Sequence, residues 1–284
     1  MKTTIAVGLL ILLASVATAE EDALATAGRA FSAGDYEKVV ELCAAIGSES
    51  DDHARALYLG GEAHLQLTQY EKAKAAFRSV LALRPKAVPA MTGLGRALVG
   101  LDRADDAVEV LRQAVKADRH DLDAQHALGD ALAAAGKPKE AAKILTKAFA
   151  RDRKSALTCR SLVEVLVAND ALAEAKTAAK QLVKSRPGQP MGYFLLGLVL
   201  DRDGEEKEAI AAYELAIEKD EKFLDAHKNL AILCHTANPL YRDRERTKKA
   251  LKHYALYFEL GGKDPELERS YLQMKGFLKS VAGD

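Results

Sequence analysis

The chain has 284 residues, of which 49% are hydrophobic and 6% aromatic, and its 41 basic residues balance its 41 acidic ones. Without a net charge there is no global field to attract nucleic acid or an anionic membrane, so neither is expected as a partner. The sequence contains no Gly-rich phosphate loop and no metalloprotease or hydrolase motif. We therefore assign no catalytic residue and no cofactor, and we do not expect an enzyme.

Residues 1–19 have the character of a secretory signal peptide. Lys2 precedes an apolar stretch from Ile5 to Val16, and Ala17-Thr18-Ala19 has the small-x-small form of a cleavage site. The alternative is an uncleaved membrane anchor, but about 15 apolar residues fall short of the ~20 that span a bilayer. We expect export to the periplasm or the extracellular space and a soluble chain after cleavage, with no transmembrane segment beyond residue 19.

A small residue recurs every 34 residues along the rest of the chain. The series is Ala27, Gly61, Gly95, Gly129, Val163, Gly197 and Ala231. Such a period is the signature of a repeat architecture in which stacked copies bury a continuous core. The sequence therefore predicts a solenoid over residues 20–263, with seven repeats that start near residues 20, 54, 88, 122, 156, 190 and 224.

Each repeat has the pattern of two amphipathic helices joined by a turn. In residues 122–155, apolar residues at helical spacing are interrupted by Gly136-Lys137-Pro138, a turn with proline near a helix start. Gly129 and Ala141 are small enough to let the two helices approach closely where they cross. The pattern predicts an all-α fold built from helical hairpins.

These repeats resemble the tetratricopeptide repeat family over residues 20 to about 260. The second repeat matches the family motif best, through Leu57, Gly61, Tyr70, Ala73, Phe77, Val80 and Pro85. The first, fifth and seventh repeats depart from it, the fifth by having Val163 at the small-residue position. The resemblance implies a right-handed superhelical solenoid whose first helices line a concave groove. It also implies protein or peptide binding without catalysis.

The family geometry projects one face of each first helix into that groove. The expected partner-binding residues are Arg55, Tyr58, Glu62, Leu65, Arg96, Val99, Asp123, His126, Asp130, Arg160, Glu164, Met191, Phe194, Leu198 and Asp201. The same projection also places Asp225 and Lys228 on this face. Phe194 with Leu198 is expected to be an adhesive apolar pair, since peptide grooves use apolar anchors ringed by polar groups. The alternative is that these apolar residues pack against a neighbouring repeat.

The seventh repeat is lengthened by seven residues, which we expect to form a basic loop between its helices. The basic residues of this loop are Arg242, Arg244, Arg246, Lys248 and Lys249. The loop could contact anionic lipid, polysaccharide or an acidic protein, or be a solvated turn. A helix is expected from Lys252 to Leu260, and Asp264-Pro265 starts another that caps the solenoid within residues 264–284.

Histidines and cysteines give little indication of a metal site. His227 and Cys234 share a helix face that we expect to be interior, with His235 facing outward, and two ligands are too few for a structural zinc. The three cysteines are expected to be buried free thiols. His126 lies between Asp123 and Asp130 at helical spacing, which should favour its charged form.

The favoured function is a non-enzymatic scaffold of the cell envelope that holds a protein or peptide in its groove. One alternative is an envelope assembly factor that contacts polysaccharide or anionic lipid through the basic loop. Another is an accessory subunit that activates a catalytic partner. The sequence identifies neither the partner nor the oligomeric state.

Overall fold

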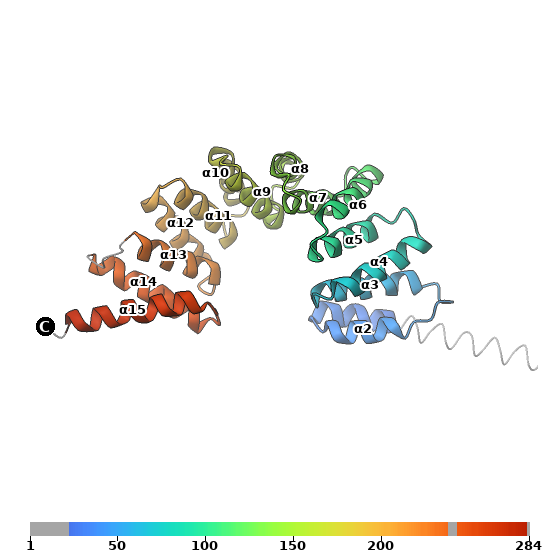
Figure 1. The fold of residues 1–284 in the computed structure, drawn as a ribbon, viewed down its shortest axis with the longest axis horizontal. Coiled ribbons are helices and arrows are strands. Elements are labelled where there is room, and N and C mark those ends of the chain that lie inside the picture. Colours follow the sequence, from blue (N-terminus) through green and yellow to red (C-terminus); the bar gives the residue numbers. More distant parts are fainter. Residues whose placement is uncertain (1–22, 238–242, 283–284) are drawn as a thin grey trace, which may run out of the picture. The chain divides into compact units, whose positions relative to one another are not determined.

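The computed structural model describes residues 23–237 and 243–282, and all regular structure in these residues is helical. A helix over residues 23–33 comes first. The following helices are α2 (Tyr36–Ala44), α3 (His53–Gln66), α4 (Tyr70–Leu83), α5 (Val88–Gly100), α6 (Ala104–Ala117), α7 (Leu122–Ala134), α8 (Pro138–Arg151), α9 (Ala156–Ala168), α10 (Leu172–Ser185), α11 (Pro190–Arg202), α12 (Glu206–Lys219), α13 (Leu224–Thr236), α14 (Arg244–Glu259) and α15 (Pro265–Ala282). The all-α fold of tandem helical hairpins is confirmed (Figure 1).

The starts of several helices follow from local sequence. Asp121 accepts a hydrogen bond from the backbone N–H of Ala124 at 2.8 Å, and Ser155 caps α9 in the same way. α5 and α11 begin with Pro89 and Pro190, whose missing N–H costs nothing in the first helical turn. These signals fix where the first helix of a repeat begins.

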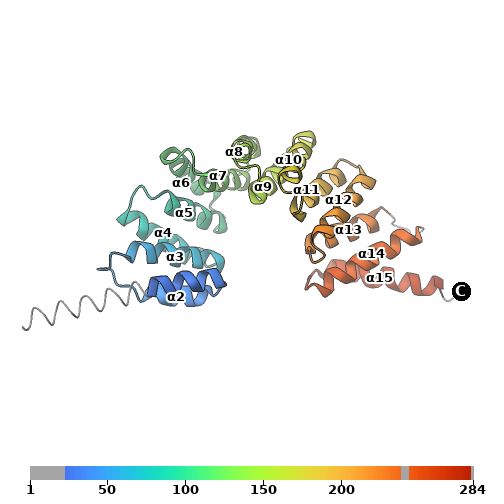
Figure 2. The same ribbon diagram turned by 180° about the vertical axis from the view of Figure 1, so that it is seen from behind.

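The helices form two compact units, which divide within α8 between Ile144 and Leu145. In the first unit each helix from α2 to α6 contacts the next in sequence, and α3, α5 and α7 also contact one another in turn. In the second unit α9, α11 and α13 are neighbours in the same way. Figure 2 shows this succession of helices from behind. The first helices of consecutive repeats therefore lie side by side within each unit.

The turn inside each repeat contains one residue in the left-handed backbone region. These residues are Gly34, Thr68, Asp102, Gly136, Asp170 and Gly204, with φ between 55° and 80°. They are again 34 residues apart, so every described turn of this kind uses the same backbone geometry. Glycine adopts this region without steric cost, whereas threonine and aspartate do not.

The expected basic loop of the seventh repeat is wrong over much of its length. α14 begins at Arg244, so Arg244, Arg246, Lys248 and Lys249 are helical. The reason is local: Asp243 caps the helix by accepting a hydrogen bond from the N–H of Arg246 at 3.0 Å, and Arg, Glu and Lys are good helix formers. Arg242 lies outside the described residues. The terminal helix is confirmed as α15, with the Asp264 carboxylate accepting from the N–H of Leu267 at 3.2 Å.

Candidate partner-binding surfaces

Three first helices of the first unit contribute to one polar cluster. The guanidinium of Arg96 on α5 lies 4.0 Å from the carboxylate of Glu62 on α3 and 3.3 Å from that of Asp123 on α7. Tyr58, one turn before Glu62, interacts with it through its hydroxyl. Together with His126 and Asp130 of α7, these residues form what we call the Arg96 cluster. The structure thus brings six of the expected groove residues together.

The cluster is partly withdrawn from water, and this changes its acid–base behaviour. Only 15% of the Glu62 side chain is exposed, and this burial raises the pKa of its carboxyl group despite the nearby Arg96. Burial, reinforced by the Glu62 charge, raises the pKa of Tyr58 to about 12. The Tyr58 ring also packs edge-on against Phe77 at 5.8 Å. Tyr58 therefore serves both the helix packing and the polar cluster.

His126 departs from the expectation of a charged surface histidine. Its side chain is 7% exposed, with Nε2 3.4 Å from the Asp130 carboxylate. Burial lowers the pKa of His126 and outweighs the attraction of Asp130. The expectation that its carboxylate neighbours favour the charged form is wrong, because the ring is held inside the helix layer.

The other expected residues of the first unit lie at the margins of this cluster. Arg55 is exposed and pairs with Asp52 on its own helix at 3.1 Å, while Leu65 and Val99 are half-buried. An ion pair between exposed neighbours on one helix contributes little free energy, so Arg55 has no fixed structural role.

In the second unit an ion pair joins α9 to α13. Arg160 Nη2 lies 2.8 Å from the Asp225 carboxylate, and its Nε lies 3.7 Å from that of Glu164. Arg160 and Asp225 belong to the fifth and seventh repeats, so this contact connects two first helices that flank α11. Asp201 of α11 is exposed.

Phe194 is not the exposed anchor that the sequence suggested. It is 4% exposed, and its ring contacts Tyr213 of α12 at 6.0 Å and Phe223, just before α13, at 5.3 Å. The alternative of packing between neighbouring repeats applies to this residue. Met191 and Leu198 remain half-buried, and Leu198 lines a shallow hollow with Val167, Asp201 and Arg202.

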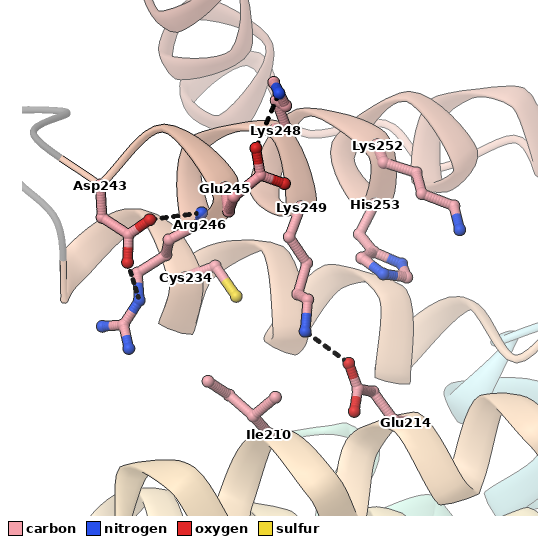
Figure 3. Close-up of a pocket in the computed structure, with 10 residues that line it drawn as sticks. All are labelled: Ile210, Glu214, Cys234, Asp243, Glu245, Arg246, Lys248, Lys249, Lys252 and His253. Atoms are coloured by element: carbon pink, nitrogen blue, oxygen red, sulfur yellow. Dashed lines mark hydrogen bonds and ion pairs between the residues drawn. The ribbon is translucent and has the colours of Figure 1, made fainter.

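The basic residues at the start of α14 face carboxylates. Figure 3 shows them around an opening of about 630 Å³ that Ile210 and Glu214 of α12 also line. The ion pairs are Arg246 with Glu206 at 2.5 Å, Lys248 with Glu245 at 2.7 Å and Lys249 with Glu214 at 2.7 Å. Because each of these cations has an acidic neighbour, the surface does not present the concentrated positive charge that an anionic lipid would need.

A buried histidine pair between α13 and α14 escaped the sequence reasoning. Nδ1 of His227 lies 2.9 Å from Nδ1 of His253, and Nε2 of His227 lies 3.0 Å from the carbonyl oxygen of Glu221. That carbonyl can only accept, so His227 Nε2 donates and its Nδ1 accepts from His253. Burial, with His227, Lys252 and Lys249 nearby, lowers the pKa of His253 to about 4.

The cysteines are buried and unbridged, as expected. Burial raises the pKa of Cys159 to about 12 and that of Cys43 to about 11, so their thiolate forms are disfavoured. Among the residues that the structure describes, no group of three or more His, Cys, Asp or Glu side chains is placed to hold a metal ion. No described helix combines the length and the apolar character needed to cross a bilayer.

Solved structures similar to this chain share its fold. A tetratricopeptide repeat protein from Parabacteroides merdae matches with a TM-score of 0.67 and 12% identity over 91% of this chain and 99% of its own. Pseudomonas aeruginosa pilF matches with a TM-score of 0.59 and 19% identity over 78% of this chain and 98% of its own. A chain of the Cut9–Hcn1 hetero-tetramer of the APC/C matches with 0.62 and 15% over 87% and 48%, respectively.

A search of curated protein sequences finds no match. Sequence models of the tetratricopeptide repeat, in contrast, match residues 64–131 and 132–195, and a second model of the same description matches residues 192–223. These matches run through more than half of the chain and coincide with the helical hairpins from α4 to α12. The chain therefore belongs to the tetratricopeptide repeat family.

Proposed function

We propose that this protein is a non-enzymatic scaffold of the cell envelope that binds a protein or peptide partner on the faces of its first helices. The tetratricopeptide fold is one of protein–protein interaction scaffolds, and its members are generally non-catalytic. The observation that carries the proposal is the Arg96 cluster, to which three consecutive first helices contribute. Polar groups held in place before binding lose little entropy when a partner arrives.

The envelope location is supported by the sequence of residues 1–19, which lie outside the described part of the structure. A leader followed by Ala17-Thr18-Ala19 directs a chain across a membrane before cleavage. A scaffold exported in this way would meet its partner outside the cytoplasm, so the test below uses intact cells.

Site-specific photo-crosslinking tests the binding face. A photoreactive amino acid replaces Leu65 on α3 or Leu198 on α11, both half-buried residues of first helices. The controls replace Leu83 on α4 and Leu215 on α12, which are apolar residues of second helices exposed by 55% and 40%. We expect covalent adducts from Leu65 and Leu198 and none from the controls. Adducts from the second helices alone, or equally from all four positions, would refute the proposed face.

A further inference from the structure

The Arg96 cluster has an excess of negative charge. Its carboxylates are Glu62, Asp123 and Asp130, and its one guanidinium is that of Arg96. His126 does not offset them, because burial disfavours its charged form. The only other cation expected on this face, Arg55, is already paired with Asp52. The face of α3, α5 and α7 is therefore acidic even though the whole chain is neutral.

The accessible charges of the cluster are the negative ones. Arg96 lies between two carboxylates, so an acidic ligand would have to displace one of them and then face the remaining carboxylates. The Asp123 side chain is 74% exposed and that of Asp130 is 43% exposed. They lie two helical turns apart on α7, within reach of two neighbouring cationic side chains of one partner. Complementary charge across such a face determines which partner binds and how fast.

We propose that the occupant of this face is a basic peptide segment, whose Lys or Arg side chains pair with Asp123 and Asp130. The inference rests on the proposed function, since it specifies the partner of the same first-helix surface. A guanidinium suits these sites better than an ammonium because it can bind a carboxylate through two parallel hydrogen bonds. The contact is electrostatic and partly exposed, so it weakens with added salt.

Peptide binding tests the charge preference directly. The probes are two fluorescein-labelled octapeptides, one alternating Arg with Ser and the other alternating Glu with Ser, and fluorescence anisotropy measures their affinity for the full chain at low and moderate salt. We expect the Arg peptide to bind and the Glu peptide not to bind. The variant D123N/D130N should bind the Arg peptide at least about fivefold more weakly.

The matched control is E41Q/E109Q, which also removes two negative charges but from α2 and α6, where both side chains are exposed. We expect this variant to bind within twofold of wild type. An equal loss in both variants would show that the peptide senses only overall charge, and an unchanged D123N/D130N variant would show that it binds elsewhere; either result overturns the inference. Circular dichroism confirms that each variant is folded.

Failure of this inference differs from failure of the proposed function. If photo-crosslinks from Leu65 reach a partner through a segment that lacks Lys and Arg, the scaffold function stands and the basic-peptide inference falls. If Leu65 and Leu198 give no adducts while the Arg peptide still requires Asp123 and Asp130, the charge preference stands and the proposed function falls.

Discussion

Two buried side chains sixteen residues apart fill the crossing between the helices of a repeat. A Cβ added at Gly61 would lie 2.9 Å from Phe77, and one at Gly197 would lie 2.7 Å from Tyr213. The fifth repeat has the larger side chain on the first helix instead, with Val163 and Ala179 both fully buried at the corresponding positions. The volume of the crossing is thus shared between two positions, which explains why Val163 does not break the repeat.

The crossing at Gly95 offers a test of this shared volume. A Cβ at Gly95 would lie 2.4 Å from Leu111 Cγ, so Gly95→Val should destabilise the fold by about 1–3 kcal/mol. Leu111→Ala alone should cost about 2–5 kcal/mol by leaving a cavity. The double variant recreates the arrangement of the fifth repeat and should lose less than the sum of the two. Urea unfolding measures all three, and additivity within about 0.5 kcal/mol would contradict a shared crossing.

Thr68 stores backbone strain in the turn of the second repeat. Its φ is 55°, a region that a β-branched residue adopts at a cost of about 1 kcal/mol or more, whereas Gly34, Gly136 and Gly204 adopt it freely in equivalent turns. Thr68→Gly should therefore raise the free energy of unfolding by roughly 0.5–1 kcal/mol, and Gly136→Ala should lower it. Thermal unfolding monitored by circular dichroism compares the two; a destabilised Thr68→Gly variant would mean that the turn tolerates threonine without strain.

At the scale of helices, the last hairpin differs from the others in the polar contact at its centre. α13 and α14 bury His227 against His253, a pair held together by one shared hydrogen bond. A second polar contact, between His235 Nδ1 and the Tyr254 hydroxyl at 3.1 Å, joins the same two helices. Buried polar groups stabilise a fold only while their hydrogen bonds are satisfied, so this hairpin is the part of the chain that should be most sensitive to acid.

The buried His253 predicts a loss of stability on acidification. Its ordinary pKa of 6.5 is lowered to about 4 in the folded chain, so the unfolded chain binds the proton more tightly. The stabilisation is fully present above pH 6.5 and is lost as the pH falls toward 4, by up to about 3 kcal/mol. Urea unfolding of the wild type between pH 7 and 4.5 should show this loss, and His253→Gln should show a flatter dependence. Equal slopes would remove the histidine pair as the cause.

At the scale of the whole molecule, the sequence predicted the fold well because the repeat makes each error visible against its neighbours. Helices begin at Val88, Leu122, Ala156, Pro190 and Leu224, 34 residues apart, at or beside the expected repeat starts. Side-chain exposure was harder to predict. Phe194 occupies a groove position in the pattern, yet Phe223, from the chain before α13, covers it. The His227–His253 pair needed knowledge of how α13 meets a helix whose start is displaced by an insertion.

Where the mature chain begins is a prediction about the whole molecule. The apolar run from Ile5 to Val16 is too short to span a bilayer, and the small residues Ala17 and Ala19 suit a signal peptidase, with acidic residues directly after them. The mature protein should therefore start at Glu20 and appear in the envelope fraction. Intact-mass spectrometry of protein from that fraction checks the start site. A mass that begins at Met1, or recovery of the protein only in the cytoplasm, would rule out cleavage and with it the exported scaffold.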